Sequence, residues 1–318
     1  MASDTIPDRP GAIDSVLFVG FGGPTAPSEV MPFLRRVVEG RGVPDERLME
    51  VAHHYEVVGG RSPYNELTEL QASAVRDWLS AAGSPLPVYV GMRTWHPFLA
   101  ETIDRMNREG RRHAAGVILA PHRSEASSGR YIDEVRRASR DAGGGPHMSY
   151  IEPWFDAPGY FSACAERIEQ ASGLRRGAWP GEVPLIFTAH SIPVRIAQAS
   201  SYVADLTVSC RGVASLLGVT AWRLAYQSRS GDPSVPWLSP DVLDVLRECA
   251  AAGASRVVLH AIGFLTDHVE VLYDLDVEAS LLAGELGMRL TRAPCVSSHP
   301  DFVAMLGGKI LDLVRRTP

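Results

Sequence analysis

The sequence predicts an α/β protein made of two similar halves, each a four-stranded parallel sheet flanked by helices. Short apolar runs alternate with segments of helical periodicity, and they divide four and four around residues 172–183. This dividing stretch is rich in Gly and Arg and contains Trp179-Pro180-Gly181. A length of 318 residues also suits two ordinary domains. We therefore predict an N-terminal domain over residues 13–172 and a C-terminal domain over residues 183–318.

Each predicted strand is a short apolar run, and a helical segment follows it. The strands are expected at residues 15–20, 87–92, 115–120, 147–151, 184–189, 221–226, 255–262 and 289–292. The helices are expected at residues 28–39, 66–82, 97–108, 130–142, 160–171, 200–217, 240–252, 268–286 and 301–315. Strands that alternate with helices in this way form parallel sheets with helices on both faces.

Four of the loops that follow strands carry unusual residues, and two of these loops belong to each half. They begin at Phe21, Pro121, His190 and Gly263. The carboxyl ends of parallel strands face the crevice in which ligands bind. We therefore expect the four loops to meet at one cleft between the two domains.

Composition argues against several classes of function. The net charge of −6 argues against a general nucleic-acid binder and against binding to an anionic membrane surface. The chain has no run of 18 apolar residues, and its polar N-terminus lacks the apolar core of a signal peptide, so we expect a cytoplasmic protein. Cys164, Cys210, Cys249 and Cys295 show no C-x-x-C spacing, which favours small buried residues over a metal site.

The most informative stretch begins at Gly263 and leads into three carboxylates spaced four residues apart, Glu270, Asp274 and Glu278. On a helix these carboxylates share one face, where each like-charged pair costs about 0.2–0.5 kcal/mol. One interpretation is a solvated acidic face. The other is a cation site, and the position favours it because the row opens where a buried strand ends.

His190 stands at the end of a buried strand. A single histidine there is usually a core residue, but a pKa near neutrality also lets it take a proton or bind a metal. Imidazole together with the Glu270 carboxylate suits a divalent ion of borderline softness, such as Fe²⁺. Two or three ligands rather than four indicate transient binding, as expected for a metal that is a substrate. Ser191 is a weak nucleophile candidate because no G-x-S-x-G elbow surrounds it.

Three further features are each open to two interpretations. Gly22 and Gly23 either form a tight turn or let the backbone approach a flat ligand, since the pattern G-x-G-x-x-G is absent. Arg229 either binds a ligand carboxylate or belongs to a structural loop that Trp237 pins. A group of arginines near the N-terminus is either surface charge or an attraction for an acidic substrate. This group consists of Arg35, Arg36, Arg41, Arg47 and Arg61.

Taken together, these motifs resemble the ferrochelatase family, whose members insert Fe²⁺ into a porphyrin in heme synthesis. The resemblance covers nearly the whole chain and rests on five motifs in family order. They lie at residues 17–24, 59–63, 188–193, 226–231 with 236–238, and 263–276. The resemblance implies two Rossmann-like, chelatase-type domains with the porphyrin in the cleft between them. It also implies Fe²⁺ as a substrate and no tightly bound cofactor.

The resemblance further implies roles for individual residues. His190 matches the active-site histidine of the family and Glu270 its partner carboxylate, and both are expected to act in catalysis and metal binding. Asp274 and Glu278 match an acidic row thought to conduct metal. The implied substrate-binding residues are Phe21, Arg41, His54, Ser62 and Tyr131. Some members hold a 2Fe–2S cluster on clustered C-terminal cysteines, but only Cys295 lies in that region, so no cluster is expected.

Some of these matches depart from the pattern of the family. Phe21 falls where some members have a tyrosine facing the porphyrin metal, and phenylalanine cannot coordinate iron. Ser62 and Tyr131, by contrast, agree with the pattern and match positions that line the porphyrin pocket. His54 stands near a place where related enzymes can carry an arginine. Arg41 lies in the stretch at 40–44 that looks like the branch acting on coproporphyrin III.

The expected activity is insertion of Fe²⁺ into coproporphyrin III, which carries four propionates, to give coproheme. Protoporphyrin IX, with two propionates, is the alternative substrate. Other candidates are a non-catalytic tetrapyrrole carrier, a periplasmic-type solute binder, and a chelatase for another ring or metal. In our hypothesis His190 takes the pyrrole protons while Glu270 desolvates and positions the metal, and the choice between proton acceptor and first metal ligand for His190 stays open.

Overall fold

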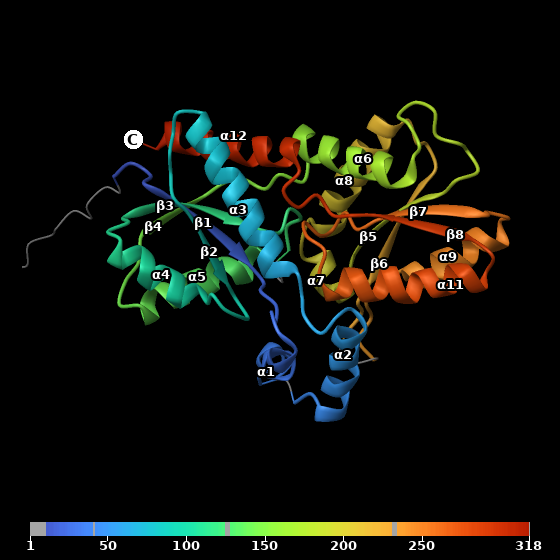
Figure 1. The fold of residues 1–318 in the computed structure, drawn as a ribbon, viewed down its shortest axis with the longest axis horizontal. Coiled ribbons are helices and arrows are strands. Elements are labelled where there is room, and N and C mark those ends of the chain that lie inside the picture. Colours follow the sequence, from blue (N-terminus) through green and yellow to red (C-terminus); the bar gives the residue numbers. More distant parts are fainter. Residues whose placement is uncertain (1–10, 41, 125–127, 231–233, 318) are drawn as a thin grey trace, which may run out of the picture.

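The computed structural model describes residues 11–40, 42–124, 128–230 and 234–317. These residues form two four-stranded sheets in which every strand pairing is parallel (Figure 1). The strand order is β2-β1-β3-β4 in the first sheet and β6-β5-β7-β8 in the second, so the same topology is used twice. This arrangement confirms the predicted fold class of two similar α/β halves.

Every predicted strand is present and lies within two residues of its expected bounds. The first sheet contains β1 (Ser15–Gly20), β2 (Val88–Met92), β3 (His113–Ile118) and β4 (His147–Tyr150). The second contains β5 (Leu185–His190), β6 (Trp222–Gln227), β7 (Arg256–His260) and β8 (Arg289–Ala293). β1 and β3 are buried along their whole length because they are the inner strands of a sheet that is covered on both faces.

The helices of the first half are η1 (Pro27–Glu29), α1 (Val30–Val37), α2 (Asp45–Val57), α3 (Tyr64–Ala81), α4 (Leu99–Arg108), α5 (Arg130–Asp141) and α6 (Pro158–Ser172). Those of the second half are α7 (Val194–Gln198), α8 (Tyr202–Leu217), α9 (Val242–Ala251), α10 (Val269–Val271), η3 (Leu272–Ala279), α11 (Ser280–Glu285) and α12 (Pro300–Arg316). The predicted set lacks α2 and α7. In α2 only Leu48 and Tyr55 are buried, which leaves little apolar periodicity to detect.

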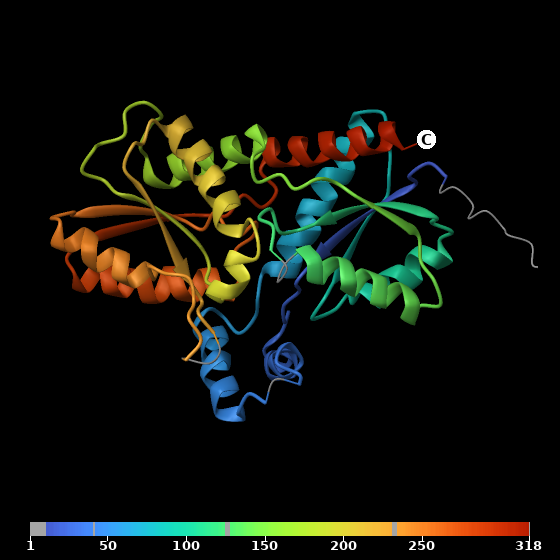
Figure 2. The same ribbon diagram turned by 180° about the vertical axis from the view of Figure 1, so that it is seen from behind.

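Two helices are exchanged between the halves. α6, which precedes the second sheet in the chain, packs on α8, β7 and β8 of the second half. α12, which follows the second sheet, packs on α3 and β3 of the first half and also contacts α6. Figures 1 and 2 show α12 above the first sheet and α6 above the second. The bounds 13–172 and 183–318 stay a prediction, but packing crosses them in both directions.

Glycines allow both exchanged helices to pack closely. A Cβ on Gly307 of α12 would overlap the indole of Trp78 on α3. A Cβ on Gly212 of α8 would likewise overlap the ring of Phe161 on α6. In each contact an aromatic ring fills the space that the missing side chain leaves. Buried apolar area contributes about 25 cal/mol per Å², so these contacts help to stabilise the exchanged arrangement.

The helices α1 and α2 form a hairpin that projects from the body of the molecule (Figures 1 and 2). Its core consists of Val30, Phe33, Leu34, Leu48 and Tyr55 from the hairpin and Val269 from the second half. His54 of α2 stacks on Tyr273, with the ring centroids 3.6 Å apart and the planes 6° from parallel. The α1–α2 hairpin therefore packs partly on the second half of the molecule, and Phe33 also contacts Trp95 of the first half.

No helix in the described ranges is both long and apolar enough to cross a membrane. The four cysteines lie within those ranges, and each is buried and free of a disulfide bond. Burial raises the pKa of the thiols of Cys164, Cys210 and Cys295, which keeps them protonated and unreactive at neutral pH.

Candidate active site

His190 and Glu270 meet in the structure although they are far apart in sequence. His190 is the last residue of β5, and Glu270 lies in α10, after the loop that follows β7. The distance from His190 Nε2 to Glu270 Oε1 is 3.6 Å, and 31% and 40% of the two side chains remain exposed. The imidazole and the carboxylate therefore form an ion pair that a ligand can reach.

Backbone contacts fix the orientation of His190. The Tyr202 hydroxyl donates a hydrogen bond to the His190 carbonyl at 2.9 Å. The ring Nδ1 lies 2.5 Å from the Ser191 carbonyl oxygen, which can only accept, so Nδ1 carries a proton. Nε2 is left to face Glu270. The Ser191 hydroxyl donates to the Leu238 carbonyl at 2.9 Å and has a structural role.

Mutual charge sets the protonation of this pair. Burial by itself lowers the pKa of His190, but the charge and hydrogen bond of Glu270, together with the Ser191 carbonyl and the charge of Asp274, outweigh burial and raise the pKa to about 9. Burial likewise raises the pKa of Glu270, but the charge and hydrogen bond of His190 together with the charge of His268 overcome burial and hold the pKa well below its usual range. Both groups are therefore charged at neutral pH as long as no third charge arrives.

The loop that carries Glu270 passes very close to β5. A Cβ on Gly263 would lie 2.7 Å from Ala189 Cβ, so glycine is required at this point. His268 caps α10, because its Nδ1 accepts a hydrogen bond from the Glu270 backbone N–H at 3.3 Å. Together these contacts hold Glu270 beside the carboxyl end of β5.

The acidic row lies on a helix, but this helix is not an α-helix throughout. Leu272–Ala279 forms a π-helix between the short helices α10 and α11. The predicted helix at residues 268–286 is therefore present, but these eight residues form a π-helix instead of an α-helix. A π-helix has i→i+5 hydrogen bonds, is rare, and is frequently found at functional sites. Asp274 and Glu278 both lie within it.

Asp274 is held by two residues from the end of β6. Ser228 donates a hydrogen bond from its hydroxyl to Asp274 Oδ2. Gln227 Nε2 lies 3.4 Å from the same oxygen and donates to the Glu270 carbonyl at 3.0 Å. Burial raises the pKa of Asp274, and the negative charges of Glu270 and Glu278 raise it further. The hydrogen bond from Ser228 lowers it in part, and the resulting pKa is about 7. Asp274 therefore exchanges a proton near neutral pH.

The electrostatics of this row suit a cation. Burial also raises the pKa of Glu278, and the negative charge of Asp241 raises it further. Raised pKa values at both Asp274 and Glu278 mean that these acids ionise less readily in the protein than they would in water. A nearby cation would reverse this, because opposite charge favours the ionised carboxylate.

The predicted residues of the first half gather around Tyr64. Phe21 follows β1, and its backbone N–H donates to the Tyr64 phenol oxygen at 3.0 Å. Ser62 is buried, and its hydroxyl accepts from the Tyr64 backbone N–H at 3.3 Å. Tyr131, in the first turn of α5, is buried too, and burial together with the neighbouring Tyr64 raises its pKa.

The remaining substrate-binding candidates are His54 and Arg41. The stack on Tyr273 puts His54 next to the π-helix. Burial lowers the pKa of His54, and the positive charges of Arg47 and His53 lower it further, so its ring is neutral at neutral pH. Arg41 lies outside the described residues, and its role stays a prediction.

Sequence reasoning assigned no role to four residues of this site, namely Tyr64, Gln227, Ser228 and His268. The signal that could have identified Gln227 and Ser228 is their position at the carboxyl end of a strand, which is the rule that singled out His190. His268 could have been identified as the cap of the helix that carries Glu270. Tyr64 gives no such signal, since it begins a helix and its contacts arise only from tertiary packing.

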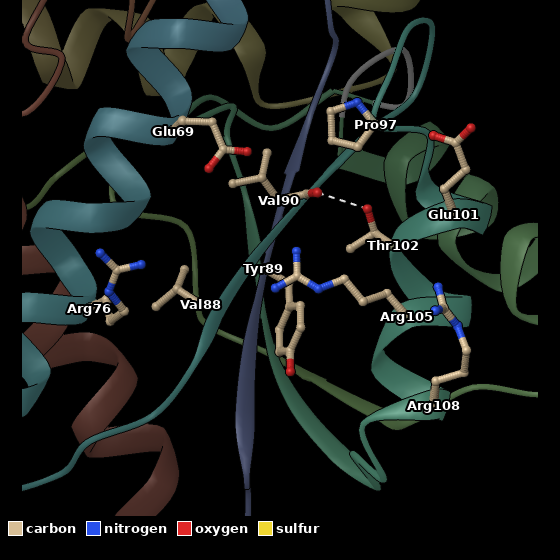
Figure 3. Close-up of a pocket in the computed structure, with 10 residues that line it drawn as sticks. All are labelled: Glu69, Arg76, Val88, Tyr89, Val90, Pro97, Glu101, Thr102, Arg105 and Arg108. Carbon is tan, nitrogen blue, oxygen red and sulfur yellow. Dashed lines mark hydrogen bonds between the residues drawn. The ribbon is translucent and has the colours of Figure 1, made fainter.

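A separate pocket of about 380 Å³ lies on the first half, between α3, β2 and α4 (Figure 3). It is lined by Glu69, Arg76, Val88, Tyr89, Val90, Pro97, Glu101, Thr102, Arg105 and Arg108. None of the predicted site residues lines it. Its three arginines already pair with acids: Arg76 with Asp77, Arg105 with Glu109 and Arg108 with Asp104. Because these charges are balanced, we assign no ligand to this pocket.

Comparison with known sequences identifies the family of this chain. A model of the ferrochelatase family matches residues 14–313. The ferrochelatase of Rhodopirellula baltica is 40% identical over 299 residues, which cover 93% of this chain and 85% of that protein. The coproporphyrin III ferrochelatase of Nocardia farcinica is 39% identical over 303 residues, which cover 92% of this chain and 85% of that protein.

Two solved structures share the fold at low sequence identity. The sirohydrochlorin chelatase SirB of Bacillus subtilis subspecies spizizenii, in complex with cobalt, has a TM-score of 0.56 and 13% identity over 96% of this chain and 95% of that chain. DR2241 of Deinococcus radiodurans has a TM-score of 0.58 and 15% identity over 94% of this chain and 55% of that chain. These two likenesses concern the fold alone. The family match and the two sequence relatives show that the chain belongs to the ferrochelatase family of metal chelatases.

Proposed function

We propose that this chain inserts Fe²⁺ into coproporphyrin III and releases Fe-coproporphyrin III (coproheme) as a step of heme biosynthesis. Membership of the family supports an enzyme that takes a porphyrin and a metal. The choice of ring draws support from the coproporphyrin III ferrochelatase of Nocardia farcinica, at 39% identity. Protoporphyrin IX is the alternative ring, since the Rhodopirellula baltica relative is named only as a ferrochelatase.

The observation that carries this proposal is the ion pair of His190 and Glu270. Metal insertion must remove two pyrrole protons and expose the nitrogen lone pairs of a flat ring to the incoming ion. The first task needs a general base, and the second needs a ligand that strips water from the ion and holds it. His190 and Glu270 offer an imidazole and a carboxylate 3.6 Å apart for these two tasks.

Arrival of the metal would couple the two tasks. At rest the imidazole of His190 is protonated because the Glu270 carboxylate balances its charge. When a divalent ion binds Glu270, the carboxylate neutralises the ion instead of the imidazolium. The pKa of His190 then falls, and the imidazole loses its proton to solvent. The neutral imidazole then accepts the first pyrrole proton from the porphyrin, releases it to solvent and accepts the second. In this sequence of events Glu270 binds the metal first, and His190 acts on the ring second.

In the proposal, Asp274 and Glu278 extend the path for ions and protons beyond this pair. Asp274, with a pKa of about 7, can give up a proton at neutral pH or exchange it for the metal. The proposed partners are a porphyrin and ferrous iron, with no tightly bound cofactor, no nucleic acid and no integral membrane association. The proposed location is the cytoplasm.

An anaerobic assay with the full chain tests the proposal. Fe²⁺ is added with coproporphyrin III or with protoporphyrin IX, and loss of the spectrum of the metal-free ring is followed against a reaction without protein. We expect kcat/KM to be at least about tenfold higher for coproporphyrin III, a difference of about 1.4 kcal/mol. Faster metallation of protoporphyrin IX would make the ring assignment wrong. Binding of coproporphyrin III without faster metallation would indicate a carrier.

A further inference from the structure

Tyr64 connects the two sides of the proposed site. It is the first residue of α3, and its ring lies against Gly20, the last residue of β1. A Cβ on Gly20 would lie 2.9 Å from the Tyr64 phenol oxygen, so the absent side chain of Gly20 makes room for the phenol. Tyr64 is thereby held at the carboxyl edge of the first sheet, where the Phe21 loop begins.

The phenol oxygen of Tyr64 holds the backbone of Phe21. It accepts a hydrogen bond from the Phe21 N–H at 3.0 Å. Burial raises the pKa of Tyr64 to about 12, and the bond from Phe21 opposes this rise only in part. The oxygen is therefore a neutral phenol at any working pH. A buried N–H that loses its acceptor is costly, so this contact fixes how the chain leaves β1.

The ring of Tyr64 also reaches the second half of the molecule. It contacts His268 edge to face, with the ring centroids 6.1 Å apart and the planes at 67°. His268 caps α10 by accepting the Glu270 backbone N–H, and Phe264 packs on the same imidazole with ring centroids 4.8 Å apart. Two aromatic rings therefore orient the histidine that orients Glu270.

We propose that Tyr64 is a positioning residue that sets the separation between Phe21 on one side of the porphyrin and Glu270 on the other. Its hydroxyl positions Phe21, and its ring positions His268 and, through it, Glu270. Neither part of Tyr64 touches the reacting atoms. This inference rests on the proposed function, because it gives Phe21 and Glu270 their places around a bound ring.

Two substitutions separate the tasks of the hydroxyl and the ring. Tyr64→Phe keeps the ring and removes the acceptor of the Phe21 N–H, so KM for coproporphyrin III should rise about fivefold while kcat stays within about twofold. Tyr64→Leu also removes the contact with His268, so kcat should fall about tenfold below that of Tyr64→Phe. The pH profile of kcat should shift in Tyr64→Leu alone, because Glu270 no longer keeps its distance from His190.

Tyr89→Phe is the matched control. It also removes a tyrosine hydroxyl, one that contacts Glu109 and Arg111 near the start of β2, away from the carboxyl edge of the sheet. Thermal unfolding is measured for all three variants. Tyr89→Phe should leave KM, kcat and the pH profile unchanged. A positioning role predicts changed kinetics in fully folded enzyme. The inference would be overturned if the activity lost in each Tyr64 variant equalled the fraction of that variant that is unfolded.

Titration of coproporphyrin III by fluorescence quenching tests the hydroxyl without turnover. We expect a Kd about fivefold higher for Tyr64→Phe than for the wild-type chain. An unchanged Kd together with an unchanged KM would overturn the inference even if the wild-type chain inserts iron. A wild-type chain that inserts no iron would instead defeat the proposed function, so the two failures are distinguishable.

Discussion

The carboxyl edges of the two sheets share one topology and differ in chemistry. In the second half the edge carries titratable groups, with His190 at the end of β5 and Glu270 in the helix after β7. In the first half the part of the edge beside β1 carries uncharged aromatic groups, with Phe21 after β1 and Tyr64 next to it. The proposed reaction needs both kinds of edge, one for the metal and the protons and one for the flat ring.

This difference lies in the last strand residues and the segments that follow them, and not in the strand order. Both sheets have the same strand order, and their inner strands are buried between helices. Loops at the ends of strands can change their residues at little cost to such a frame. A repeated scaffold can therefore provide two unlike surfaces that face one ligand.

The largest effect is expected from a substitution that removes the proposed base, His190, from the edge that carries the titratable groups. His190→Ala should lower kcat for Fe²⁺ insertion by about 10²–10⁴-fold, the range for loss of a general base. Coproporphyrin III should still bind, because the aromatic edge is untouched. Initial rates and fluorescence titration measure the two quantities on the same preparation. Turnover at the wild-type rate would mean that the base lies elsewhere.

The next effect concerns the pH dependence of the same edge. Asp274, with a pKa of about 7, loses its proton between about pH 6 and pH 8. If the ionised form serves the reaction, Asp274→Asn should lower kcat about tenfold at pH 8 and much less at pH 6, where wild-type Asp274 is already protonated. A loss that is equal at both pH values would contradict this role.

Stability should change in the opposite direction in the same variant. The pKa of Asp274 is higher in the folded protein than in an unfolded chain, where aspartate has a pKa of about 3.9. The wild-type carboxyl therefore destabilises the fold progressively as pH rises above that value. Asp274→Asn should raise the Tm at pH 8 and should leave it nearly unchanged at pH 4.

The smallest effect on the chemistry concerns a contact that joins the two halves. Arg123, in the loop after β3, binds Asp205 of α8 with Nε 3.0 Å from Oδ2, and the Asp205 side chain is only 3% exposed. Arg123→Ala leaves this buried carboxylate without its cation. The free energy of unfolding at pH 7 should fall by about 3 kcal/mol, while kcat at 25 °C should stay near the wild-type value.

The pH dependence of this loss follows from the pKa of Asp205. Burial alone would raise this pKa, but Arg123 outweighs burial and lowers it. The stabilisation is therefore complete above the unfolded pKa of about 3.9 and disappears as pH falls through the folded value. Denaturant unfolding at pH 7 and pH 3 measures this. Arg108→Ala, which breaks the exposed pair with Asp104, is the control and should cost less than about 1 kcal/mol.

The strands and the meeting of His190 with Glu270 could be predicted because both depend on local signals. Apolar runs fix the strands, and both residues follow inner strands of one parallel sheet, β5 and β7, which pair directly. α2 could not be predicted, because part of the apolar surface that stabilises it is Val269 of the other half. The π-helix could not be predicted either, because its residues show the periodicity of an ordinary helix. The contacts of Ser228 and Gln227 with Asp274 join distant parts of the chain, so no local pattern indicates them.

The exchange of α6 and α12 affects how the chain can fold as it is synthesised. β1 to β4 leave the ribosome early, but α12 (Pro300–Arg316), which packs on α3 and β3, is made only after the second sheet. Until then the apolar residues of α3 and β3 that share a core cluster with Leu306 and Ile310 lack the cover of α12. A nascent chain stalled before α12, or a fragment cut at residue 172, would therefore expose an apolar, aggregation-prone surface and depend on chaperones.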